Sequence, residues 1–114
     1  MFANFDESQF PIINITLNNR IENDKDFNNF LCKWLKYYLE QQEVIFIFDA
    51  TNVGFVPIKY CFKMSAFIKN LKKNDYQYLQ KSIIIVQSNF VKSMLDLIFY
   101  IQPPVAPVYI IQKQ

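Results

Sequence analysis

The amino-acid sequence predicts a single α/β domain, with a mostly parallel sheet of four to five strands flanked by helices. Short apolar runs alternate along the chain with longer segments whose apolar residues recur every three or four positions. The run Val44–Phe48 is apolar without a break and ends in Asp49, which is typical of a strand buried on both faces. The chain contains one glycine, too few for an all-β fold with many tight turns.

The first part of the chain predicts two strands and a helix. Residues 1–10 mix phenylalanines with polar side chains and predict a short edge strand or arm. Ile12–Leu17 alternates apolar and polar residues after Ile12, which predicts a strand with one wetter face. Asp24–Gln42 predicts a helix with Asp24 as its N-cap. Its sheet-facing stripe is expected to contain Phe27, Phe30, Leu31, Trp34, Leu35 and Tyr38.

After Val44–Phe48 the chain alternates between helix and strand to its end. Because helices connect successive strands, we expect right-handed crossovers and a parallel sheet with helices above and below it. Two helix boundaries are supported by proline. Pro57 suits the first turn of a helix, and Pro103-Pro104 end the helix that precedes them. The predicted elements are a helix from Pro57 to about Lys73, a strand at Ser82–Val86, a helix from Ser88 or Asn89 to about Ile101, and a strand at Val108–Ile111.

Length and composition narrow the class of protein. The 114 residues form one predicted domain, 1–114, and 52% of them are hydrophobic, enough to build a core. A net charge of +2 does not by itself indicate nucleic-acid binding. The N-terminus lacks the pattern of a signal peptide, and no apolar run reaches the length of a membrane span. Cys32 and Cys61 are expected to be reduced, structural thiols of a cytoplasmic protein.

Residues for catalysis and for metal binding are scarce. The chain has no histidine, no cysteine cluster and no glycine-rich phosphate loop, so triads, zinc sites and nucleotide loops are excluded. Asp49, Asp75 and Asp96 are the remaining candidates for a pair of carboxylates that act as acid and base, but nothing in the sequence places Asp96 near Asp49. Asp49 is expected to serve the turn after its strand by accepting a backbone N–H bond from Thr51 or Asn52. We therefore expect no enzyme, no catalytic residue, no cofactor and no metal.

The second predicted helix carries lysines on one side and an aromatic residue among them. Lys59, Lys63, Lys69 and Lys73 form either a solvated face or a surface for an acidic protein, a phosphoinositide or a nucleic acid. Phe62 lies between these lysines, and an exposed ring on a polar face is typical of an interface. We expect Phe62 to be partly exposed and to contact a partner.

The central stretch FIFDATNVGFVPIKYCFKMSAFIKNL resembles the centre of STAS domains, the SpoIIAA-like fold of anti-sigma-factor antagonists. SIIIVQSNFVKSMLDLIF resembles their next strand and helix, and PVYII their last strand, so the resemblance covers residues 10–111. It implies a β-α superhelix in which each strand lies beside the last, and a non-enzymatic role in protein–protein regulation. Phosphorylation often switches such domains at a hydroxyl where the helix after the central strand begins. Here Val56-Pro57-Ile58 has none, so no phosphorylation switch is expected.

The stretch IIIVQSNFVKSMLDLIFYIQPPVAPVYII is also similar to CRAL-TRIO (Sec14-like) lipid-binding domains. That resemblance implies an alternative function, binding of a lipid or small apolar ligand in a pocket under the third helix. CRAL-TRIO domains carry extra helices around the lipid. The present chain is short for a ligand pocket of about 300–1,000 Å³.

The function expected from the sequence is therefore a STAS-like regulatory or protein-interaction module. Its partner is expected to be another protein, and a second copy of the chain is one candidate. No nucleic-acid partner is expected. A weak contact with a lipid or a membrane surface is left open. Ligands of α/β folds bind where the parallel strands end, so the partner is placed at the end of the central strand. The predicted partner-binding residues are Asp49, Thr51, Asn52, Phe55, Pro57, Lys59, Phe62 and Lys63.

Overall fold

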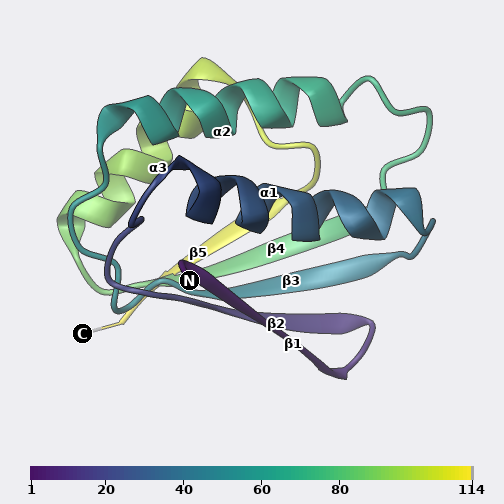
Figure 1. Cartoon of the computed structure of the whole chain (residues 1–114), viewed down its shortest axis with the longest axis horizontal. Coiled ribbons are helices and arrows are strands. Elements are labelled where there is room, and N and C mark those ends of the chain that lie inside the picture. The colour runs from purple at the N-terminus through teal and green to yellow at the C-terminus, as the bar shows by residue number, and fades with distance from the viewer. Residues whose placement is uncertain (114) are drawn as a thin grey trace.

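The computed structural model describes residues 1–113, and position 114, the last of the predicted domain, lies outside the described residues. The chain forms the predicted α/β domain, in which the strands pair in the order in which they occur in the sequence (Figure 1). The first strand runs antiparallel to the second, and the other neighbours are parallel. The elements are β1 (Ala3–Gln9), β2 (Ile12–Leu17), α1 (Asp24–Leu39), β3 (Val44–Asp49), α2 (Ile58–Leu71), β4 (Leu79–Val86), α3 (Asn89–Ile101) and β5 (Val108–Gln112).

All three helices lie on one side of the sheet (Figure 1). The expectation of helices above and below the sheet is therefore wrong. In β3, Val44, Phe46 and Phe48 are buried under the helices, whereas Ile45 and Ile47 on the opposite face are only partly buried. A right-handed crossover from each strand to its next neighbour always passes over the same face. Sequential strand order thus leaves the second face without a helix.

The ends of the helices differ from the expected ones in identifiable ways. The N-cap of α1 is Asn23, whose side chain accepts a 2.8 Å bond from the backbone N–H of Asp26, so Asp24 is not the cap. The helices α1 and α2 stop at Leu39 and Leu71, a few residues before the predicted ends. The cap of α3 is Ser88, one of the two expected residues.

Of residues 1–10, which predicted an edge strand or arm, Ala3–Gln9 form the edge strand β1. Phe2 lies edge-on to Phe30 of α1, with ring centroids 5.6 Å apart, and Phe5 stacks on Tyr37 at 6.4 Å. The backbone N–H of Phe2 also donates a 2.8 Å bond to the Asp26 carboxylate. These contacts fasten β1 to α1 through side chains as well as through the sheet.

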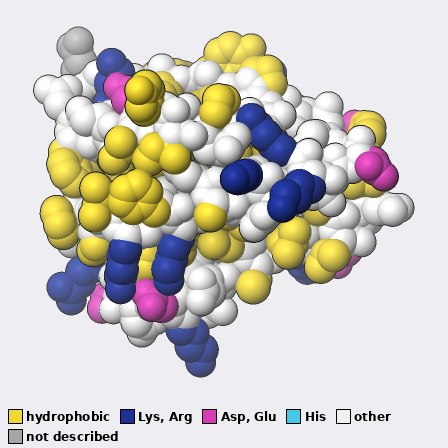
Figure 2. Space-filling model, turned by 90° about the horizontal axis from the view of Figure 1, so that it is seen from above, with side chains coloured by type: hydrophobic (Ala, Val, Ile, Leu, Met, Phe, Trp, Pro, Cys, Tyr) yellow, Lys and Arg dark blue, Asp and Glu magenta, His cyan; other side chains and the backbone are white. Residues whose placement is uncertain are grey.

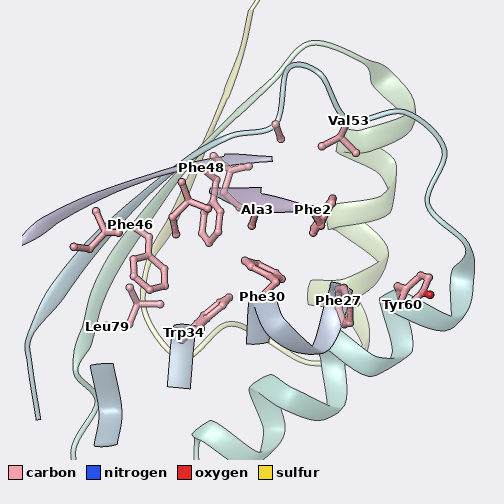
Figure 3. Packing of buried hydrophobic residues seen from close by; sticks show 14 of the residues in the cluster. Phe2, Ala3, Phe27, Phe30, Trp34, Phe46, Phe48, Val53, Tyr60 and Leu79 are labelled. Atoms are coloured by element: carbon pink, nitrogen blue, oxygen red, sulfur yellow. The ribbon is translucent and has the colours of Figure 1, made fainter. Parts of the chain in front are cut away.

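The core between α1 and the sheet is built from aromatic rings (Figure 3). Trp34 meets the rings of Phe46 and Phe67 edge-on, with centroids 5.2 and 5.3 Å away. Such pairs contribute about 0.5–1.5 kcal/mol each beyond the area they bury. Leu35, which the stripe pattern placed inside, is exposed, and Tyr37 is buried in its place against Phe46. The helix is therefore rotated toward β1, whose Phe5 ring Tyr37 also contacts.

Replacing Phe46 by alanine is expected to lower the free energy of unfolding by about 3–5 kcal/mol, because Phe46 is fully buried among four other rings. Urea denaturation measures the change. Phe62→Ala is the matched control, since Phe62 is half exposed and its loss should change stability by about 0.5 kcal/mol or less. Equal losses for both variants would contradict this assignment of the core.

Candidate functional site

The loop of residues 50–57 connects the carboxyl end of β3 to α2 and lies beside the start of α3. At its beginning the loop is bonded to the neighbouring strand β4, because the backbone N–H of Ala50 donates a 2.8 Å bond to the carbonyl of Ile85. The carboxyl ends of parallel strands are the usual binding position in α/β folds. The predicted partner-binding residues lie in and around this loop.

Asp49 organises the beginning of the loop. Its Oδ1 accepts bonds from the backbone N–H of Thr51 at 3.0 Å and from the Thr51 hydroxyl at 2.6 Å, which confirms the expected turn. These bonds hold the pKa of Asp49 below its usual value, with a smaller contribution from the charge of Lys113. The carboxylate is therefore a structural, ionised group at neutral pH.

The middle of the loop is held in place on both sides of Phe55. Val53 and Val56 are buried in the core. The backbone N–H of Gly54 donates a 2.8 Å bond to the carbonyl of Asn19, in the loop before α1. A Cβ atom at position 54 would lie 2.6 Å from Asn19 Oδ1, so a larger residue there would require the Asn19 side chain to move. Phe55 projects between these anchors and remains 71% exposed.

Phe55 belongs to a larger exposed surface, which we call the apolar patch. Its ring stacks on Phe90, the second residue of α3, with centroids 6.0 Å apart. Ile58 and Phe62 continue the patch along one face of α2, and Phe62 is 52% exposed, as predicted. Figure 2 shows hydrophobic side chains gathered at this end of the molecule, above the helices. The apolar patch consists of Phe55, Ile58, Phe62 and Phe90.

The lysines beside the apolar patch are engaged by an acidic residue from α1. The ammonium groups of Lys59 and Lys63 lie 3.2 and 3.5 Å from Oδ1 of Asp24. Tyr60 donates a 2.8 Å hydrogen bond to the same oxygen. The Tyr60 bond, and then Lys59, lower the pKa of Asp24. The residue predicted as a helix cap thus joins α1 to the first turns of α2, and it offsets part of the lysine charge.

The predicted partner-binding residues fall into three groups rather than one surface. Asp49 points to the sheet face opposite the helices, as its place in the alternation of β3 requires. Lys59 and Lys63 flank the apolar patch, to which Phe55 and Phe62 belong. Asn52 is exposed in the loop, and Pro57 immediately precedes the first residue of α2.

Ile58 and Phe90 are members of the apolar patch that the sequence prediction omitted. Ile58 precedes Phe62 by four positions, which places the two on one helix face, so its membership could have been found from spacing. Phe90 joins the patch through the packing of α3 beside α2, which the local sequence pattern does not reveal.

A cavity of about 120 Å³ lies between the helices and the sheet. Side chains of α3 form part of its wall, at the place where a ligand pocket was expected, and nearly all of the lining is apolar. An apolar void of about 150 Å³ holds a molecule the size of benzene. The volume is smaller than the roughly 300 Å³ at which pockets for drug-sized ligands begin.

Thr51→Val is expected to raise the pKa of Asp49 and to destabilise the fold at neutral pH. A lowered carboxyl pKa contributes stability that is present above the unfolded value and is lost as pH falls through the folded value. The difference between variant and wild type should therefore be full at neutral pH and shrink as the pH falls below the ordinary carboxyl pKa. Carboxyl-carbon NMR titration and urea denaturation measure the two effects. Thr16→Val, on the neighbouring strand, is the control, and an unchanged Asp49 titration would contradict the assignment.

Within residues 1–113 no group of three or more His, Cys, Asp and Glu side chains is arranged to hold a metal ion. None of the helices described has the length and apolar character needed to cross a membrane. Comparison with known proteins gives no match to a family model, to a curated protein or to a solved structure.

Proposed function

We propose that the chain is a STAS-like, non-enzymatic interaction module that regulates another protein by binding it through the apolar patch. The exposure of the apolar patch is the observation that carries this proposal. Four aromatic or isoleucine side chains from two helices and one loop stand in solvent at the edge where the parallel strands end. Contiguous exposed apolar surface at such a position is typical of a binding site for a protein.

The apolar patch is preorganised, which favours binding. Val53, Val56 and the Gly54–Asn19 hydrogen bond hold the backbone on either side of Phe55. Phe55 is further restrained by its stacking on Phe90. A partner that covers these rings loses little of its binding energy to ordering the loop. The apolar centre with charged residues at its edge also matches the composition of protein interfaces, in which aromatic anchors carry most of the affinity.

The arrangement of strands supports the STAS-like part of the proposal. STAS domains place each strand beside the last, and this chain has the same sequential order. The hydroxyl that operates the phosphorylation switch of such domains is missing, because α2 begins with Ile58 and Lys59. The Tyr60 hydroxyl, which follows, is bonded to Asp24. We propose binding that phosphorylation at this helix does not control.

Transport of a lipid or small apolar ligand is the second candidate, favoured by the cavity under α3. Its volume of about 120 Å³ is small for a lipid, so the apolar patch supports the interaction module more strongly. Native mass spectrometry of the freshly purified chain separates the two. A bound lipid mass would support the carrier, whereas the mass of the chain or of its oligomer alone would count against it.

The proposed function is tested by affinity purification of the tagged chain from its native host, with proteins quantified by mass spectrometry. Phe62→Ser and Ile58→Ser should each reduce recovery of the partner at least about tenfold, since loss of an anchor residue commonly costs 2 kcal/mol or more. Leu39→Ser is the control, because Leu39 is more exposed than Ile58 or Phe62 but is the last residue of α1, away from the apolar patch. Recovery of the same proteins in the same amounts with all three variants would refute the proposal.

A further inference from the structure

The face of the sheet opposite the helices is a second apolar surface, separate from the apolar patch. Successive side chains of a strand point to opposite faces, so the residues that alternate with the core residues lie here. The strand register places Ile47, Ile83 and Tyr109 in one row across β3, β4 and β5. Tyr109 and Ile111 are 56% and 53% exposed. We define the open face by Ile12, Ile45, Ile47, Ile83, Ile85, Tyr109 and Ile111.

The central strands have the apolar sequence that is typical of a sheet with both faces covered. The runs VIFIF in β3 and IIIV in β4 are apolar at every position. Parallel sheets occur almost only with both faces buried, whereas a sheet face that meets water normally alternates in polar residues. Polar residues alternate on this face in β2, as Asn14 and Thr16, whereas in β3 to β5 the residues between Lys81 and Asp49 on this face are apolar. The described residues provide no helix for this face.

We propose that the open face binds the open face of a second copy of the chain, to form a two-fold symmetric dimer of stacked sheets. Face-to-face packing of two sheets is a standard way of burying such surfaces. A two-fold interface uses the same surface on both subunits, and is the commonest symmetry of soluble oligomers. The proposal does not depend on the function proposed above, because the open face and the apolar patch lie on opposite sides of the sheet.

The charges at the two ends of the open face are self-complementary. Lys81 lies beside Ile45, at the end of the face where the parallel strands begin. Asp49 lies beside Ile85, at the end where they finish. If the sheets stack with their strands running in opposite directions, Lys81 of each copy lies near Asp49 of the other. Sheets stack about 10 Å apart, a gap that a lysine and an aspartate side chain span together.

Asp49 is available for this contact. Both bonds from Thr51 end on Oδ1, which leaves Oδ2 without a hydrogen-bond donor among the described residues. In the alternative arrangement, the strands of the two copies run in the same direction and the two β4 strands lie over each other. Lys81 of one copy would then face Lys81 of the other. Like charges brought together in this way disfavour an interface, so the charge pattern selects the antiparallel dimer.

The size of the sheet is sufficient for a modest dimer. Five strands spaced about 4.8 Å apart, each about 20 Å long, give a face of roughly 500 Å² in flat projection. Side chains corrugate the face, so its accessible area is larger and approaches the roughly 800 Å² per partner of a standard interface. The seven apolar residues of the open face extend from β2 to the edge strand β5, and the polar residues of β1 and β2 lie along the other edge.

Sedimentation equilibrium of the purified full chain over a range of concentrations tests the dimer. The expected result is a mass of twice 13.7 kDa at high micromolar concentration. Tyr109→Lys and Ile111→Lys should each weaken the dimer about tenfold or more, without unfolding a chain in which both residues are exposed. Leu39→Lys is the control and should leave the dimer unchanged. A monomer at every concentration, or a dimer insensitive to both lysine variants, overturns the proposal.

A charge exchange tests the antiparallel arrangement. Lys81→Glu alone places a glutamate near the partner's aspartate, and Asp49→Lys alone places two lysines together, so each variant alone should dimerise more weakly than wild type. An equimolar mixture of the two variants should form a heterodimer in which both pairs are again opposite in charge. No preference for the heterodimer over the two homodimers, measured by native mass spectrometry, overturns the arrangement.

Discussion

The right-handed crossover between neighbouring parallel strands is the constraint on which the rest of the structure depends. Because each strand from β2 to β5 lies beside the one before it, every crossover passes over the same face. That face receives all three helices and the aromatic core. The same geometry gathers the loops after β3 and β4 at one edge, where α2 and α3 begin side by side. Both exposed apolar surfaces follow from this single constraint.

The sequence was sufficient to predict the alternation of strands and helices, because each element carries its own periodicity. It was also sufficient for local chemistry. The turn at Asp49 involves residues two positions apart, and the exposure of Phe62 follows from its place among lysines. The assumption that failed was that an apolar strand is covered on both faces by its own chain. The run Val44–Phe48 is apolar toward both faces, but strand order decides which faces the chain itself covers, and order is not encoded within one strand.

The other differences have the same physical origin in tertiary packing. Leu35 and Tyr37 exchange their expected positions because α1 also packs on β1, whose path across the sheet the helical period does not reveal. Asp24 was assigned to its own helix end, yet its partners Lys59, Lys63 and Tyr60 come from a helix more than thirty positions later. The site was therefore predictable where its residues are adjacent in sequence, and not where two helices bring their side chains together.

The cavity between the helices and the sheet has a consequence for the volume of the molecule. Unfolding eliminates internal voids, so the unfolded chain with its solvent occupies less space than the folded one. With about 120 Å³ of cavity between the helices and the sheet, hydrostatic pressure is expected to favour the unfolded chain. The same void gives Met64 and Met94 in its wall room to change rotamer without displacing the sheet. The layer between the helices and the sheet therefore holds volume that unfolding removes.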